Sequence, residues 1–530
     1  MEHKIDRISE LPEHVVEHIL SFIPMRKILQ LSILSKRWQN VWALLPITEF
    51  SQYIPEFDPY KYSKKLGNIS DKEKEQKIQR KKDDFSYFME RSLRSRYREG
   101  LSINMFKLEM LFSESDSALL NRCIGYAIES NVKEFDIELD EVEPECFYDQ
   151  LPKSVLTAKS ITKLSLDSFK LDSIFYSDIN LPSLKKLSFD GVCVDDQVIQ
   201  ALIDGCPVVE DISIRCCYGL KSIHVSGLLK LMALELMLNP DLERVEVQAS
   251  NLQSLHIYDD YQLCQINLAP SENLNRLLLH ATTITDKWLD DFLLKHPRME
   301  ILDLAFCNVL ERVYILSRHM KTLNLSRCEK LDEVNINTPN LHTFGYFGGG
   351  DISFSFNTMA LSEANLSFLG GTPWSVEKIS FLTKLSHPKL LTWRTELVES
   401  LIIPKELRES QPSSLYNVKK LELKALSSPK RNEMSELLDA LLWISPLLNI
   451  LLIEWEDKNM SIHSIFFKFS YETPIYKGEN PNCCKRLAYT CRRHCLKTVK
   501  IEDSGGFADK KELEKYFSEN AKNMKSFQYS

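Results

Sequence analysis

Long apolar runs are missing from this 530-residue sequence, and so is any overall basic charge. No stretch approaches the roughly 18 uninterrupted apolar residues that a membrane-spanning helix needs. The opening stretch MEHKIDRISE has no apolar core of signal-peptide length. The formal net charge of −8 provides no basic field that would hold nucleic-acid phosphates. We therefore expect a partner that is neither a membrane nor a nucleic acid.

A cysteine spacing typical of a disulfide framework or a zinc site is also missing. The 13 cysteines are odd in number and scattered, which indicates reduced thiols that serve mostly as small core residues. The cluster Cys483, Cys484, Cys491, His494 and Cys495 contains no Cys-x-x-Cys pair, so structural cysteines are favoured over zinc ligands. We expect a cytoplasmic or nuclear protein without a bound metal or cofactor.

Catalytic signatures are absent as well. The sequence has no Gly-x-x-x-x-Gly-Lys-Ser/Thr phosphate loop, no His-Glu-x-x-His and no Gly-x-Ser-x-Gly. The acidic pairs Asp195-Asp196 and Asp290-Asp291 are expected to open helices, where negative charge interacts favourably with the helix dipole. We therefore expect a non-catalytic protein.

What the sequence does contain is a repeat of the unit apolar-x-x-apolar-x-apolar. Its middle anchors recur at intervals of 21 to 25 residues, a regularity that chance does not explain. The anchors are Leu164, Leu187, Ile212, Leu234, Leu255, Leu277, Leu302, Leu323 and Phe344. The pattern resembles leucine-rich repeats, in which each copy contributes one short strand to a curved parallel sheet.

The segments between these strands predict the outer layer of the solenoid. The two 25-residue intervals contain DDQVIQALIDGCP and TDKWLDDFLLKHP, which predict helices, whereas the shorter intervals predict turns or single helical turns. The stretch FGYFGGGDISFSFN predicts a break in the pattern, with a loop at 348–350 followed by a strand-like run. Beyond it the copies are degenerate, with further strands expected at 418–423 and 448–453.

Strand alternation determines which side chains project from the concave face of the sheet. The projecting residues form a mixed polar and aromatic lining, which suits a protein partner. The target-binding candidates are Arg215, Glu235, His256, Tyr258, Arg276, His280, Asp303, Asn324 and Phe347, with Asp211, Ser213 and Gly345 beside them. For any single residue, an exposed sheet face without a dedicated ligand is the favoured interpretation, whereas the face as a whole favours binding.

The first 50 residues predict three short helices, at 9–23, about 25–31 and about 32–43. So few residues do not easily supply a core of their own, and their large apolar side chains predict a partner surface that completes it. The stretch LPEHVVEHILSFIP…ILQLSILSKRWQNVWALLP resembles an F-box of the plant type. The resemblance implies a Skp-family adaptor, joined to a cullin scaffold, that contacts Leu11, Pro12, Ile19, Leu20, Leu31, Trp38, Val41 and Trp42. Packing within the chain alone is the alternative.

Two further segments flank the repeats. Residues 61–84 are polar and charge-dense, which predicts a mobile loop, with a weak import signal at 79–82 as the alternative to plain solvation. The helix expected after this loop, ended by Gly100, would seat the array.

At the C-terminal end of the sequence, CLKTVKIED predicts a strand and 509–528 an amphipathic helix. Residues 483–527 resemble the FBD module of plant F-box proteins, which implies a cap on the solenoid.

These features together predict an α/β solenoid that follows a three-helix F-box and ends in a strand–helix cap. The expected domains are 1–50, 51–100, 101–410, 411–480 and 481–530, the fourth of which holds degenerate repeats. The resemblance implies a non-catalytic substrate-recognition subunit of an SCF-type cullin ubiquitin ligase, which holds an unknown target protein. A small-molecule-gated F-box receptor and a repeat scaffold outside any ligase are the alternatives.

Overall fold

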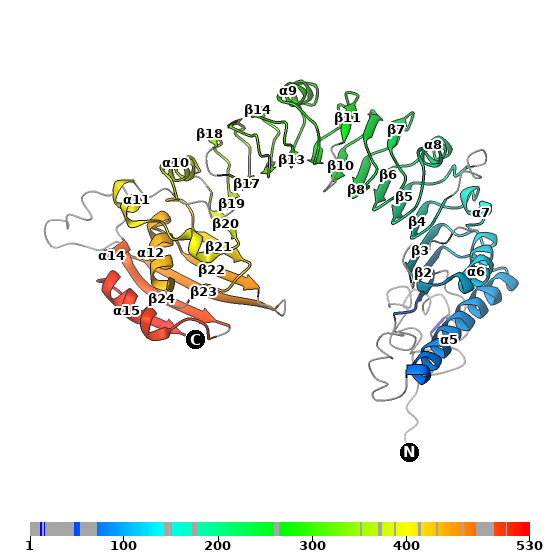
Figure 1. Ribbon diagram of the computed structural model, residues 1–530, viewed down its shortest axis with the longest axis horizontal. Coiled ribbons are helices and arrows are strands. Elements are labelled where there is room, and N and C mark those ends of the chain that lie inside the picture. The colour runs from blue at the N-terminus through cyan, green and yellow to red at the C-terminus, as the bar shows by residue number, and fades with distance from the viewer. Residues whose placement is uncertain are drawn as a thin grey trace, which may run out of the picture. The chain divides into compact units, whose positions relative to one another are not determined.

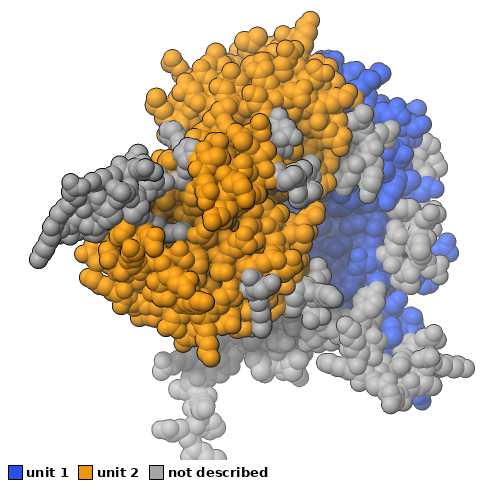
Figure 2. All heavy atoms as spheres, turned by 60° about the vertical axis from the view of Figure 1, so that its left-hand side comes forward, with its two compact units in different colours: residues 1–271 blue, residues 272–530 orange. Residues whose placement is uncertain are grey.

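The chain forms two compact units, residues 1–271 and residues 272–530 (Figure 2). The computed structural model describes residues 11, 12, 15, 47–53, 71–141, 148, 151–171, 179–258, 264–349, 352–368, 374–385, 388–411, 415–430, 433–456, 461–472, 492–504 and 506–530. In both units, short parallel strands form a main sheet, and helices and further strands lie behind it (Figure 1). The expected α/β solenoid is thereby confirmed.

The main sheet of unit 1 is parallel, with the strand order β1-β2-β3-β4-β5-β6-β8-β10. Its strands are β1 (Ile47–Ser51), β2 (Met105–Phe112), β3 (Glu134–Glu141), β4 (Lys163–Asp167), β5 (Lys186–Asp190), β6 (Asp211–Arg215), β8 (Ala233–Met237) and β10 (Ser254–Tyr258). A second parallel sheet contains β7 (Ser222–Ser226), β9 (Arg244–Gln248) and β11 (Gln265–Leu268). The helices are α5 (Asp71–Arg98), α6 (Ser117–Glu129), α7 (Lys153–Leu156), α8 (Asp196–Gly205) and the 3-10 turn η1 (Glu114–Asp116).

The main sheet of unit 2 is parallel from β12 to β22. Strand β23 then pairs antiparallel with β22 and β24, and the last strand, β25, pairs parallel with β24. Its strands are β12 (Arg276–His280), β13 (Ile301–Ala305), β15 (Thr322–Ser326), β17 (Thr343–Gly348), β19 (Glu363–Phe368), β20 (Leu390–Thr395), β21 (Lys420–Ala425), β22 (Ile450–Glu456), β23 (Ile462–Tyr471), β24 (Leu496–Asp503) and β25 (Ser526–Tyr529). The second sheet contains β14 (Arg312–Leu316), β16 (Glu333–Asn337) and β18 (Ser353–Asn357). The helices are α9 (Asp286–Lys295), α10 (Val376–Lys384), α11 (Lys405–Ser410), α12 (Met434–Ile444), α14 (Arg492–Cys495), α15 (Lys510–Asn520) and η4 (Val398–Leu401).

Strand alternation gives each main sheet one buried face and one open face. All nine repeat anchors are at most 4% exposed, while the side chains on either side of them stay half-exposed or exposed on what we call the open face. Several strands are followed directly by a residue with positive φ, such as Cys216 at 51° after β6 and Phe306 at 53° after β13. The Cys216 N–H donates to the Met237 carbonyl of the next strand at 2.9 Å, so the chain leaves the sheet without an unpaired backbone donor.

Both helices expected in the 25-residue intervals are present. The Asp195 carboxylate caps α8 by accepting hydrogen bonds from the backbone N–H groups of Gln197 and Val198, both at 2.9 Å. Helix α9 begins one turn earlier than its acidic pair suggested, because Thr285 caps it. The expectation that Asp290-Asp291 opens a helix was therefore wrong. No helix among the described residues is long and apolar enough to cross a membrane.

Helix α5 occupies residues 71–84 of the segment 61–84, where a mobile loop was expected. Residues 71–84 are helical, whereas 61–70 lie outside the described residues. Lys, Glu and Gln have high helix propensity, and the segment continues a helix that Phe85, Met89 and Leu93 bury against the unit. The expected seating helix is present, ends at Arg98 and is followed by Gly100 with φ of +67°.

The shorter repeat intervals contain strands rather than the turns expected there. Segments such as SIHVS, RVEVQ, RVYIL and EVNIN alternate buried and accessible side chains, and stacking of successive copies pairs them into the second sheets. The repeat also does not break after Gly348, because β18, β19 and β20 continue both sheets. The strands expected at 418–423 and 448–453 are present as β21 and β22.

The expected C-terminal helix is shorter than predicted. Helix α15 ends at Asn520, and Phe527 lies on β25, which pairs parallel with β24. The segment MKSFQY repeats the apolar-x-x-apolar-x-apolar unit, so its last residues pair as a strand instead of extending the helix. The strand expected at CLKTVKIED is present as β24.

Candidate functional site

Every target-binding candidate lies on a main-sheet strand. In unit 1, Arg215 lies on β6, Glu235 on β8, and His256 and Tyr258 on β10. In unit 2, Arg276 and His280 lie on β12, Asp303 on β13, Asn324 on β15 and Phe347 on β17. The structure therefore arranges them in two groups, one in each unit.

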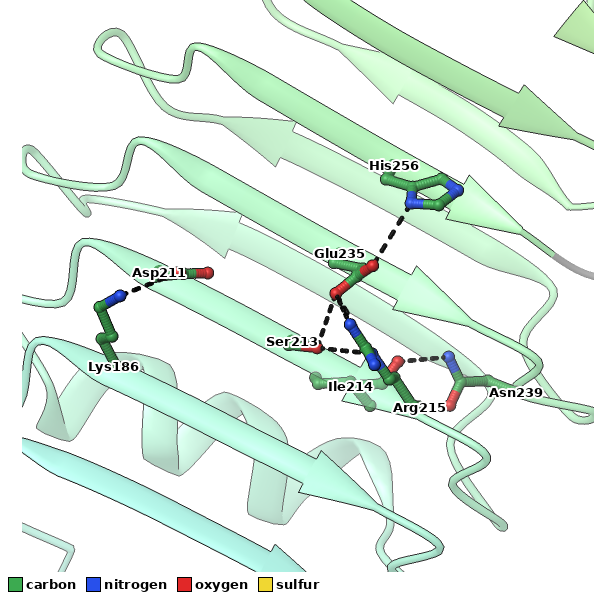
Figure 3. Close-up of polar contacts among 8 residues, drawn as sticks. All are labelled: Lys186, Asp211, Ser213, Ile214, Arg215, Glu235, Asn239 and His256. Carbon is green, nitrogen blue, oxygen red and sulfur yellow. Dashed lines mark hydrogen bonds and ion pairs between the residues drawn. The ribbon is translucent and has the colours of Figure 1, made fainter. Parts of the chain in front are cut away.

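In unit 1, Glu235 is the centre of a polar network on the open face (Figure 3). Its Oε2 accepts hydrogen bonds from Ser213 Oγ at 2.9 Å and from Arg215 Nη2 at 2.6 Å. The His256 Nδ1 lies 3.4 Å from Glu235 Oε1. Burial raises the pKa of the Glu235 carboxyl, but the hydrogen bonds from Arg215 and Ser213 outweigh burial, and the pKa lies below its ordinary value. The carboxylate thus stays ionised and holds Arg215 in place.

A second ion pair and a buried amide flank this network (Figure 3). Lys186 Nζ lies 3.8 Å from the Asp211 carboxylate at the amino-terminal ends of β5 and β6. Asn239, only 1% exposed, donates to the Ile214 carbonyl at 3.0 Å and accepts from the Cys217 N–H at 2.9 Å. Asn239 therefore fixes the strand ends that carry Arg215 and Glu235.

Sequence reasoning missed a row of carboxylates on the same face of unit 1. Glu109, Glu138, Asp167 and Asp190 lie directly opposite one another on β2, β3, β4 and β5. Burial, together with the neighbouring Asp190 and Glu138, raises the pKa of Asp167 to about 6, although Ser168 donates a hydrogen bond to it. Glu109 and Glu138 precede the first repeat anchor, Leu164, while Asp167 and Asp190 follow the first two anchors. Only the pairing of the strands shows that the four carboxylates form one row.

In unit 2, three of the candidates form a connected group. The Asn324 amide donates to Asp303 Oδ2 at 2.9 Å, and His280 Nε2 lies 3.5 Å from Asp303 Oδ1. The next residue across the sheet is Gly345, where a Cβ atom would collide with the Asn324 side-chain oxygen. Glycine at this position therefore lets the Asn324 amide lie across the sheet. Arg276 lies at the opposite end of β12, opposite Ile301, and takes no part in this group.

A groove of about 740 Å³ extends from this group across the carboxyl ends of the unit 2 strands. Asp303, Asn324 and Phe347 line it, as sequence reasoning anticipated for the open face. Arg327, Arg394, Lys424, Glu454 and Trp455 also line it and were missed. The spacing between β20, which carries Arg394, and the previous anchors is irregular. The position of Arg394 on the open face therefore became clear only from the pairing of β20 with β19.

The adaptor-binding candidates lie mostly outside the described residues. Leu11 is half-buried and Pro12 exposed, and the Pro12 carbonyl accepts a hydrogen bond from the Val15 N–H at 3.0 Å. Ile19, Leu20, Leu31, Trp38, Val41 and Trp42 fall outside the described part of the chain. Their assignment remains a prediction from the sequence.

The residues weighed as zinc ligands give no metal centre in the described chain. Cys483, Cys484 and Cys491 lie outside it, while Cys495 is a buried free thiol. No group of three or more His, Cys, Asp or Glu side chains in the described ranges is arranged to hold a metal ion. Most of the described cysteines are buried free thiols, as expected of core residues.

Both the repeat region and the N-terminal segment of the chain match known domain families. Residues 95–269 and 264–527 match the leucine-rich-repeat domain described as At1g61320/AtMIF1, LRR domain, and residues 8–50 match the F-box domain. Together the repeat-domain matches cover most of the chain. They also include the segment after 350, where the repeats could not be followed in the sequence.

Similar proteins come from Arabidopsis thaliana. The putative F-box/LRR-repeat protein At5g02930 is 27% identical over 263 residues, which are 48% of this chain and 46% of the relative. The putative F-box/FBD/LRR-repeat protein At4g03220 is 26% identical over 298 residues, 53% of each chain. The putative F-box/FBD/LRR-repeat protein At3g56780 is 23% identical over 404 residues, 74% of this chain and 83% of the relative. The chain spans about half the length of the first two relatives.

Proposed function

We propose that this chain, which belongs to the family of proteins that join an F-box to a leucine-rich-repeat domain, is a substrate-recognition subunit of an SCF-type cullin ubiquitin ligase. The observation that carries this proposal is the combination of an F-box match at 8–50 with a repeat-domain match over most of the remaining chain. The F-box would bind a Skp-family adaptor, and through it the cullin scaffold. The open faces of the main sheets would hold a target protein.

This role requires no catalytic group in the chain. Holding a target close to a ubiquitin-charged enzyme raises the effective concentration of the reacting groups, which is itself a large contribution to rate. The open faces offer side chains that suit such holding, with ion pairs and hydrogen bonds that keep them in place. We also propose a cytoplasmic or nuclear location, which is supported by the free thiols of the described chain.

Co-purification with a Skp-family adaptor tests the proposal. We expect the intact chain to bring down the adaptor, and a variant with Leu11→Ala, Pro12→Ala and Trp38→Ala to lose it while its circular dichroism stays unchanged. The matched control carries Trp288→Ala, Pro297→Ala and Leu316→Ala, the same residue types in unit 2, and should keep the adaptor. A well-folded intact chain that brings down no adaptor would leave a repeat scaffold outside any ligase as the better account.

A further inference from the structure

The groove in unit 2 has an ordered floor and a row of side chains above it. Register pairs Asn324, Gly345 and Asn365 across the floor. The row beyond pairs Phe347 with Ser367, Ser367 with Arg394 and, further along, Lys424 with Glu454. The lining crosses the seven strands from β13 to β22 and includes Ile462 at the start of β23; at about 4.8 Å between neighbours, the seven strands span roughly 30 Å. That length fits about nine residues of an extended peptide.

Two positive groups of the groove, Arg327 and Arg394, are available to a ligand, while Lys424 and the carboxylates Asp303 and Glu454 are already engaged. Asp303 accepts from Asn324, and Glu454 lies 3.5 Å from Lys424. Among the described residues, the guanidinium groups of Arg327 and Arg394 have no acidic partner, and both side chains are exposed.

Arg327 is held in position by aromatic rings. Its guanidinium lies 4.6 Å from the centre of the Phe347 ring and 5.4 Å from that of Phe306. The ring faces restrict the side chain but leave its N–H donors free, which prepares it for a carboxylate. The β15 to β20 side of the groove is therefore complementary to negative charge.

The other side of the groove is apolar at its rim. Leu426 follows β21 and is 70% exposed, and Ile462 begins β23 and is 76% exposed. Glu396 follows β20 and Glu456 is the last residue of β22, the strands on either side of β21, and the two carboxylates flank Leu426. An apolar side chain of a ligand would cover Leu426 and Ile462, and the flanking carboxylates would disfavour a second acid there.

We propose that the groove binds an extended segment of a target protein that carries an acidic side chain, recognised by Arg327 and Arg394, and an apolar side chain, recognised by Leu426 and Ile462. This inference rests on the proposed function, because it names the class of target segment that the recognition subunit takes. The acidic residue lies toward β15 to β20, and the apolar residue lies toward β21 and β23.

Selection from phage-displayed random dodecapeptides on the intact chain tests the inference. We expect the selected peptides to be enriched in Asp or Glu a few residues away from Leu, Ile or Phe. Arg394→Glu should lower the acidic enrichment at least tenfold and favour Lys or Arg in its place. Arg298→Glu makes the same charge change at an exposed position outside the groove and should leave the enrichment as it was. Peptides without acidic enrichment, or with enrichment unchanged by Arg394→Glu, would overturn the inference.

A synthetic peptide from that selection then tests the apolar rim by fluorescence polarisation. Leu426→Asp should weaken its binding at least tenfold, whereas Leu316→Asp, which replaces an even more exposed leucine on β14, should not change it. Equal binding by both variants would overturn the apolar half of the inference. Each variant is also tested for adaptor co-purification. An intact chain that brings down the adaptor but selects no such peptide contradicts the groove alone, whereas an intact chain that binds the peptide but brings down no adaptor contradicts the ligase role alone.

Discussion

The Arg215 guanidinium donates a 2.6 Å hydrogen bond to Glu235, and the pair joins strands β6 and β8 on the open face of unit 1. Ser213 donates to the same oxygen of Glu235 at 2.9 Å. The face is therefore organised before any partner binds, which lowers the entropy that binding would otherwise cost.

Replacing Glu235 by Gln should lower the free energy of unfolding by about 0.5–1 kcal/mol at pH 7, since the pair is partly exposed. The folded-state pKa of Glu235 lies below the unfolded value of about 4.3, so its contribution is present above that pH. The contribution is lost as the pH falls through the folded pKa, so the difference seen at pH 7 should shrink at a pH below that pKa. Urea unfolding followed by circular dichroism measures both differences. An equal difference at both pH values would contradict this origin.

Replacing Asp167 by Asn should stabilise the protein at pH 8. The folded-state pKa of about 6 exceeds the unfolded value of about 3.9, so the carboxylate costs stability above pH 6, and the cost disappears as the pH falls toward 4. Solvent screening at this half-buried side chain reduces the expected gain to about 1 kcal/mol. Urea unfolding at pH 8 and pH 4 measures it, and Asp167→Glu, which keeps the charge, should show no gain. A gain of equal size at pH 4 would count against the explanation.

Replacing Asn239 by Ala should cost about 2–3 kcal/mol. The change leaves the Cys217 N–H and the Ile214 carbonyl buried without the partner they now have. Asn251→Ala removes an exposed amide that donates to the Leu229 carbonyl, and it should cost less than about 1 kcal/mol. Urea unfolding of the two variants compares them directly, and similar losses would show that burial of Asn239 is not decisive.

Replacing Gly345 by Ala should cost about 1–2 kcal/mol, because the new Cβ displaces the Asn324 side chain and breaks its hydrogen bond to Asp303. A double-mutant cycle with Asn324→Ala isolates this contact. The cost of Gly345→Ala should shrink by about 1 kcal/mol once Asn324 is truncated. Strict additivity of the two unfolding free energies would contradict the steric account.

The repeats were predictable because nine buried anchors recur at nearly constant spacing, and burial of one strand face requires that pattern. The second sheets were not predictable from the sequence, because each of their strands is only four or five residues long and is stabilised by stacking on its neighbours. Residues 71–84 show the limit of composition as a guide. Their charges suggested a loop, whereas an adjacent buried helical segment extends the helix through them.

The candidate site was predictable in part. Alternation placed Arg215, Glu235 and Asn324 on the open face, but it carries no information on which side chains meet across strands. The groove was missed because β19 has Ala364 where earlier copies have a large apolar anchor, so the register of Arg394 could not be read onward. All the adaptor-binding candidates, Leu11 and Pro12 included, still rest on the sequence alone.

The proposed ligase role is tested by the mass of the intact chain mixed with a purified Skp-family adaptor, measured by light scattering during size-exclusion chromatography. A recognition subunit that binds the adaptor through its F-box should give one species with the mass of a one-to-one complex, and separate components when Leu11, Pro12 and Trp38 are all replaced by Ala. Separate components with the intact, folded chain would contradict this role.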